Sequence, residues 1–92
     1  MREKEIEKYL GEQVKKLKGV SWKWTGTSGV PDRIVMLPGG QLMFVELKTA
    51  HGIVSPIQSV IHKRMKRLGF GVHVVRSKED VDELLGCYKI KI

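Results

Sequence analysis

The fold of this chain is decided by residues 31–48, which read PDRIVMLPGGQLMFVELK. Two apolar runs flank the Pro-Gly-Gly of residues 38–40, a pattern that predicts a strand, a tight turn and a second strand. If residues 38–40 form the loop, paired positions sum to 78 and Asp32 lies opposite Glu46, with Cβ atoms roughly 4.5–5.5 Å apart. Lys48 then emerges on the same face as Glu46, because side chains two residues apart in a strand share a face.

The residue pattern also allows a second register. A two-residue loop at Gly39-Gly40 would place Asp32 and Glu46 on opposite faces of the hairpin. Both faces of the hairpin are otherwise apolar, apart from Arg33, which is typical of central, buried strands. Buried carboxylates tend to be paired, metal-bound or functional. The acids and Lys48 therefore indicate a Mg²⁺ site with a general base or charge stabiliser, although alternating Glu-Lys pairs also occur on solvated sheet faces.

Size and charge narrow the class of protein. Ninety-two residues suffice for one domain, residues 1–92, with one core. No apolar run approaches the roughly 20 residues of a transmembrane helix, so we expect no membrane partner. The lone Cys87 cannot form an internal disulfide; it is expected to be a small packing residue in a reducing cytoplasm. The net charge of +7 favours nucleic acid as partner, the alternative being a basic protein that only needs solubility.

The N-terminal third alternates between helix and strand signals. Residues 3–18 predict an amphipathic helix with a buried stripe of Ile6, Leu10, Val14 and Leu17. Residues 20–25 predict a half-exposed strand. Trp22 and Trp24 are expected in the core, with stacking on bases as the alternative. Residues 26–31 form a flexible loop that leads into Asp32.

The C-terminal half predicts a helix, a strand and a helix. Ser55, Pro56 and Gln58 complete a capping box that begins a helix over 56–68. Its buried stripe is expected to contain Ile57, Val60, Ile61, Met65 and Leu68, while the positions mostly outside it are His62, Lys63, Arg64, Lys66 and Arg67. A strand over 71–76 should run parallel to residues 43–48. Ser77 caps a last helix with Asp80 at its third position, and the buried residues are expected to be Val81, Leu84 and Leu85. Residues 88–92 suit a short edge strand. The order is α-β-β-β-α-β-α, an α/β fold with a mixed central sheet flanked by helices.

In this order of elements the chain resembles the PD-(D/E)XK nuclease superfamily, with its restriction-endonuclease-like core. The motifs Gly29-Val30-Pro31-Asp32, Phe44-Val45-Glu46-Leu47-Lys48 and Ser55-Pro56-Ile57-Gln58 are similar to those of the VRR-NUC domain (virus-type replication-repair nuclease), in its stand-alone, phage-type form. Together, in this order, the motifs are fairly specific, whereas each alone is weak.

The resemblance implies a role for each matching residue. Asp32, Glu46 and the backbone carbonyl of Leu47 would ligate Mg²⁺ or Mn²⁺, which suits hard oxygen donors. Lys48 would position or deprotonate the attacking water or stabilise charge at the phosphate, and Gln58 would contribute from its helix. In related resolvases an acid on the first helix, in a Glu-x-x-hydrophobic pattern, often completes the site. Glu3, followed by Ile6, fits this pattern best. Glu7 with Leu10 fits too, and Glu12 with Lys15 fits less well.

The implied function is a metal-dependent endonuclease that hydrolyses phosphodiester bonds in branched DNA such as four-way (Holliday) junctions. It would act as a homodimer, without a small-molecule organic cofactor, in the cytoplasm of a bacterial or phage-infected cell. The residues expected to hold the DNA backbone are Lys15, Lys18, Lys63, Arg64, Lys66 and Arg67. One alternative is a non-catalytic basic DNA-binding module on the same fold. Another is a basic protein-interaction module, which would leave the acids and Lys48 without a purpose.

Overall fold

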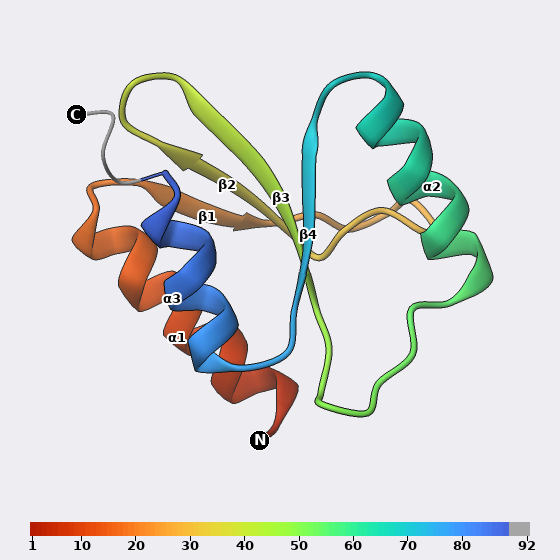
Figure 1. The fold of residues 1–92 in the computed structure, drawn as a ribbon, viewed down its shortest axis with the longest axis horizontal. Helices are drawn as coiled ribbons and strands as arrows, with labels where there is room; N and C mark the ends of the chain where they lie inside the picture. The colour runs from red at the N-terminus through yellow and green to blue at the C-terminus, as the bar shows by residue number, and fades with distance from the viewer. Residues whose placement is uncertain (89–92) are drawn as a thin grey trace.

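The structure, a computed structural model, describes residues 1–88 and contains the seven expected elements in the expected order (Figure 1). They are α1 (Glu3–Lys16), β1 (Val20–Lys23), β2 (Arg33–Leu37), β3 (Gln41–Leu47), α2 (Pro56–Arg67), β4 (Gly71–Val75) and α3 (Lys78–Gly86). The first helix and the first strand each end two residues earlier than expected. The edge strand expected over 88–92 falls, apart from Tyr88, outside the described residues.

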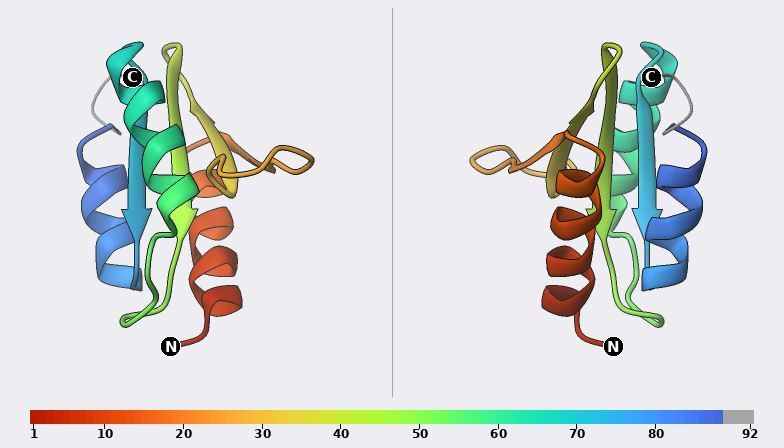
Figure 2. Two further views of the ribbon diagram at one scale, coloured as in Figure 1. Left: turned by 90° about the vertical axis from the view of Figure 1, so that its right-hand side faces the viewer. Right: turned by 90° about the vertical axis from the view of Figure 1, so that its left-hand side faces the viewer.

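The four strands form one mixed sheet in the order β1-β2-β3-β4. The first three strands are antiparallel neighbours, and β4 runs parallel to β3, as the strand-helix-strand crossover requires. Helices α1 and α3 lie together on one face, and α2 lies on the other (Figures 1 and 2). The predicted α/β class with a sheet between helices is therefore confirmed.

The β2-β3 hairpin adopts the register in which paired positions sum to 78. Arg33 pairs with Val45, and Leu37 pairs with Gln41 across the turn at residues 38–40. Gly39 and Gly40 have φ angles of 85° and 74°, a left-handed conformation that favours glycine at both positions. This register excludes the two-residue loop and brings the end of β3 beside Asp32.

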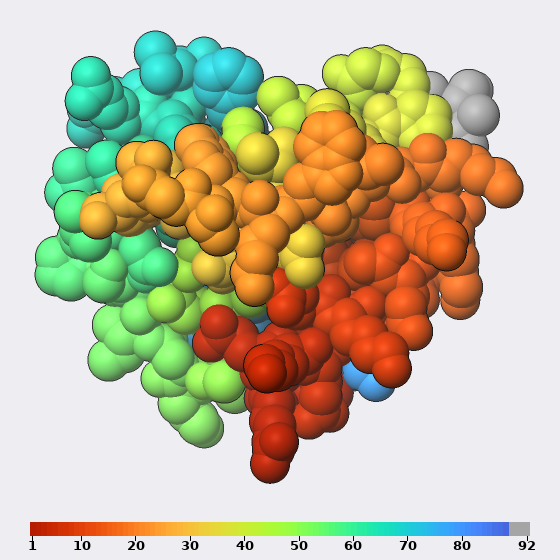
Figure 3. Space-filling view, turned by 180° about the vertical axis from the view of Figure 1, so that it is seen from behind, coloured from red at the N-terminus to blue at the C-terminus, as the bar shows by residue number. Residues whose placement is uncertain are grey.

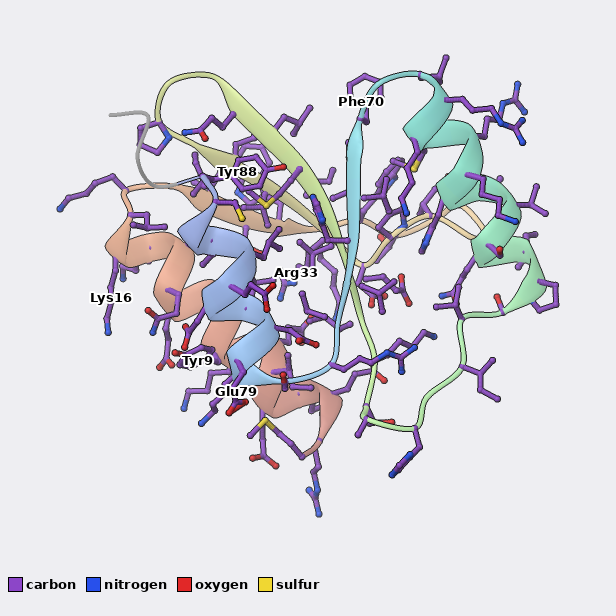
Figure 4. The ribbon with its side chains drawn as sticks, in the orientation of Figure 1. Tyr9, Lys16, Arg33, Phe70, Glu79 and Tyr88 are labelled. Carbon is purple, nitrogen blue, oxygen red and sulfur yellow. The ribbon has the colours of Figure 1, made fainter. Side chains whose placement is uncertain are left out.

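The hydrophobic core lies between the sheet and the α1-α3 pair. It is built from one side of α1, β2, β3, β4 and α3, as the apolar periodicity of these elements predicts. Its buried members are Ile6, Leu10, Val14, Val35, Leu37, Met43, Val45, Leu47, Val75, Val81, Leu84 and Leu85. Arg33 is the charged exception on this side. It extends from β2 toward α1 (Figure 4), where its guanidinium lies 3.1 Å from Glu7 Oε2.

The buried stripe expected on α2 is wrong at three of its five positions. Ile57, Val60 and Leu68 are exposed, Leu68 by 71%, and only Ile61 and Met65 are half-buried. His62, expected outside the stripe, is the buried residue of this helix. The reason is that α2 packs against β4 and covers only part of its face of the sheet, so a narrow strip of the helix is enclosed.

The same partial cover explains two tryptophans. Trp22, expected in the core, is 57% exposed because α2 does not extend over β1. Trp24 is half-buried and packs against Phe44 with ring centroids 5.4 Å apart, and Phe44 in turn contacts Phe70. Phe70 lies at the junction of α2 and β4 (Figure 4).

Two further expectations concern Cys87 and the membrane. Cys87 is exposed, so its expected packing role is wrong. It directly follows the last turn of α3. Among residues 1–88, no helix combines the length and the apolar character needed to cross a bilayer.

Candidate active site

Asp32 lies in the bend that enters β2, directly beside the end of β3. Its carboxylate oxygen Oδ2 accepts a hydrogen bond of 2.8 Å from the backbone N–H of Leu47. Its own carbonyl accepts from the N–H of Trp24, so the bend is held to β1 as well. Asp32 is thus tied by main-chain contacts to the segment that carries Glu46, Leu47 and Lys48.

Glu46 is the most enclosed charged residue among those described, with 1% of its surface exposed. Its Oε2 accepts a hydrogen bond of 2.8 Å from Gln58 Nε2 and lies 3.3 Å from Lys48 Nζ. Its Oε1 has no hydrogen-bond partner although it is buried. A buried carboxylate with one satisfied and one unsatisfied oxygen needs an explanation, and a cation or a further donor at Oε1 would supply it.

The electrostatics of Glu46 reflect its burial. Burial raises the pKa of its carboxyl above the usual value, and the nearby negative charge of Asp32 raises it further. Contacts from Lys48 and Gln58 act in the opposite direction and lower this pKa. A carboxyl group whose pKa is raised by burial and by a neighbouring negative charge lies in a site that a positive ion would stabilise.

Gln58 joins the start of α2 to Glu46. Its side-chain oxygen Oε1 accepts a hydrogen bond from the backbone N–H of Ser55. The backbone N–H of Gln58 donates to Ser55 Oγ, which completes the capping box. Its Nε2 is left free for Glu46. The two roles considered for Gln58 therefore occur together, because the amide oxygen serves one and the amide nitrogen the other.

The acids of α1 are divided between two places. Glu3 and Glu7 line a pocket of about 270 Å³ together with Lys4, Lys23, Asp32 and Leu47. The space-filling view shows the corresponding hollow between the start of α1, the loop after β1 and the segment after β3 (Figure 3). Glu7 is already paired with Arg33, whereas Glu12 lines a different hollow with Tyr9 and Lys78. Glu3 and Glu7 are thus the α1 acids beside Asp32.

His62 is the residue near the site that the sequence reasoning missed. It is 5% exposed, and its Nε2 lies 3.9 Å from Glu46 Oε1. A signal for it does exist in the sequence, since His62 follows Gln58 by four residues and so shares its face of the helix. The expected apolar stripe pointed to a different face.

The donor set fits a divalent metal in kind. Asp32 and Glu46 offer carboxylate oxygens, which Mg²⁺ and Mn²⁺ prefer, and Glu46 Oε1 is unpartnered. Within residues 1–88, no three His, Cys, Asp or Glu side chains form a ready-made metal cluster. A main-chain oxygen or waters would therefore complete the coordination, as is usual for Mg²⁺.

The basic residues expected to hold DNA do not form one surface. All six are exposed, but they divide between the two sides of the sheet. Lys15 and Lys18 lie at the end of α1, and the other four lie on α2, namely Lys63, Arg64, Lys66 and Arg67. The α2 group shares its face of the sheet with Glu46.

Comparison with known proteins agrees with this arrangement. No protein-family model matches the chain. The chain is 39% identical over 87 residues to the protein named "Putative nuclease p44" of Acyrthosiphon pisum secondary endosymbiont phage 1, and the match covers 92% of each chain. A solved structure described as a VRR_NUC domain superposes with a TM-score of 0.83 at 36% identity, covering 94% of this chain and 96% of that one.

The fold is that of the PD-(D/E)XK nuclease superfamily. Within it, the chain belongs to the VRR-NUC family, as its motifs predicted.

Proposed function

We propose that this protein is a metal-dependent endonuclease that hydrolyses phosphodiester bonds in branched DNA, such as four-way junctions. The observation that carries the proposal is Glu46, a buried carboxylate that contacts Lys48 and Gln58 and keeps one oxygen unpartnered. Burying an acid beside a lysine carries a desolvation cost. Groups buried at such a cost cluster at functional sites. The membership of the VRR-NUC family and the similarity to a protein named as a nuclease support the reaction class.

The residues that would hold Mg²⁺ or Mn²⁺ are Asp32, Glu46 and the backbone carbonyl of Leu47, with Glu3 as the first-helix acid. When bound, the ion would neutralise charge at the phosphate and lower the pKa of a ligated water. The chain's own contribution is orientation. Leu47 N–H holds the Asp32 carboxylate, and Gln58 holds that of Glu46.

Lys48 would act on the water or on the phosphate. Its ammonium lies within 3.3 Å of Glu46, and its side chain is 18% exposed. It therefore borders both the enclosed site and solvent, where a phosphodiester can enter. A lysine in such a position can donate to developing negative charge on the phosphate.

Exposed cations on α2 support a DNA substrate. Four Lys and Arg side chains project from the helix that supplies Gln58, and they can neutralise phosphates without reading bases. None of the helices and strands described between residues 1 and 88 presents base-reading side chains at regular spacing, so we infer selectivity for DNA shape. The proposed place of action is the cytoplasm of a bacterial or phage-infected cell, and the ion would be the only cofactor.

A homodimer follows from the proposed substrate, because a four-way junction needs two cuts and this chain is small. The face of the sheet that α2 leaves uncovered suits a second copy. Val20, Met36 and Leu42 are paired neighbours across three strands, and Trp22 and Ile34 are paired in the next row. Contiguous exposed apolar surface of this kind is typical of an interface.

The deciding experiment compares a labelled four-way junction with a linear duplex of equal length in Mg²⁺, in Mn²⁺ and in chelator. We expect metal-dependent cleavage of the junction in preference to the duplex. Binding without cleavage in either metal would favour the second candidate, a non-catalytic DNA-binding module on the same fold. No binding at moderate salt would exclude both.

A further inference from the structure

The second turn of α2 places a buried imidazole against the unpartnered oxygen of Glu46. His62 Nε2 lies 3.9 Å from Glu46 Oε1, and both atoms are buried without a hydrogen-bond partner. Buried polar atoms without partners are rare in proteins. That two of them face each other indicates that they form one functional unit.

We propose that His62 is a positioning residue that orients the Glu46 carboxylate for metal binding by donating from its Nε2–H to Oε1. The inference rests on the proposed metal site. A closure of about 1 Å would bring the two atoms to hydrogen-bond distance. Hydrogen bonds in catalytic sites are often long in the unliganded protein and tighten when the site is filled.

The arrangement on α2 makes His62 a partner of Gln58. The two residues are four positions apart and therefore lie on one face of the helix. Gln58 donates to Oε2, and His62 faces Oε1, so one helix face addresses both oxygens of the carboxylate. Two such contacts would fix the rotation of the Glu46 carboxylate about its Cγ–Cδ bond. A single contact leaves this rotation free.

The test measures Mn²⁺ affinity of the full chain, by titration with detection of free Mn²⁺ by electron paramagnetic resonance. His62→Phe keeps a planar ring and removes the donor, and we expect it to weaken Mn²⁺ binding by about 10–100-fold. His62→Gln restores an amide donor near the place of Nε2, and we expect it to recover at least about tenfold of that loss. A pure packing role predicts the reverse order.

His73→Phe is the matched control. His73 is half-buried and, like His62, has a pKa lowered by burial, but it contacts Tyr88 rather than the site. We expect the Mn²⁺ affinity of the His73→Phe variant to equal that of the parental protein. If His62→Phe fails to fold, as judged by circular dichroism, His62→Met replaces it as an apolar side chain that adapts to irregular space.

The outcomes separate this inference from the proposed function. Parental affinity in His62→Phe, or an equal loss in the phenylalanine and glutamine variants, would overturn the role of His62 and leave the metal site standing. A parental protein that binds no Mn²⁺ would overturn the metal site itself and this inference with it. A loss in His62→Phe with recovery in His62→Gln would establish the role.

Discussion

Replacement of Lys48 with methionine tests the proposed chemistry most directly. The change removes the ammonium group that lies 3.3 Å from Glu46 Oε2 and keeps most of the apolar stem. A positioned proton-transfer group typically contributes about 10²–10⁴-fold to a rate. We expect the single-turnover rate on a four-way junction to fall by that factor, which corresponds to about 2.7–5.5 kcal/mol of activation free energy.

DNA binding by the same variant should change little. The Lys48 side chain is 18% exposed, and it is one of 17 lysines and arginines in the chain. The slope of the logarithm of affinity against the logarithm of salt concentration should therefore change by less than about 1, the value for one lost phosphate contact. The loss should appear in the rate at saturating enzyme and not in the dissociation constant.

The assay uses enzyme in excess over labelled junction and follows cleavage in Mn²⁺ by rapid quench. Lys8→Met is the control, because Lys8 is an exposed lysine on α1 outside the site. Its rate should equal that of the parental protein. A Lys48→Met rate within about threefold of the parental rate would refute the role of Lys48, since the expected loss is at least about 10²-fold.

Three other predictions concern stability and assembly. Gly29→Ala should lower the free energy of unfolding by about 2–4 kcal/mol. The reasons are that Gly29 has a φ angle of +83° and that the alanine Cβ would lie 2.8 Å from Ile61 Cγ1. Gly26→Ala, with φ +92° and open space around it, should cost only about 1 kcal/mol, so equal thermal melts for the two would contradict the packing argument. Glu46→Gln in chelator should be more stable than the parental protein near pH 7 and lose that advantage toward pH 4. The pKa of Glu46 is higher in the folded state than in the unfolded state. The free energy of unfolding of the parental protein therefore falls as the pH rises from the pKa of the unfolded state through that of the folded state. Thermal melts across this pH range would show the opposite trend if burial did not dominate the shift. Trp22→Glu should convert a dimer into a folded monomer, measured as mass in solution by light scattering, and a parental monomer would rule out the proposed assembly.

Elements with clean local signals could be predicted from the sequence. In the α1 stripe Ile6, Leu10 and Val14 are fully buried and Leu17 is partly buried. The capping box of Ser55 and Gln58 begins α2 where expected. These signals are local, because a helix stripe or a cap depends on residues within one or two turns. The weaker predictions, on Trp22 and on the stripe of α2, failed because exposure depends on which other elements cover a surface.

The features of the candidate site also divide into those that the sequence predicted and those that depend on tertiary packing. The residue types and spacing of Asp32, Glu46, Lys48 and Gln58 were visible in the sequence, and the resemblance to the VRR-NUC family indicated their common site. The hairpin register was not visible, because both turn geometries suit Pro-Gly-Gly. His62 was also missed, since its contact with Glu46 depends on how α2 packs on the sheet and not on the spacing of residues within the helix.

The sequence by itself determined the order of elements, the family and the chemical groups available for catalysis, because these follow from local periodicity and motif. Tertiary structure decided that the hairpin pairs in the register that brings Asp32 to the end of β3. It also decided that the narrow contact of α2 with the sheet buries His62 and exposes Leu68. The physical reason is that burial and carboxylate environment are properties of packed surfaces, and a surface is complete only when segments far apart in the chain meet.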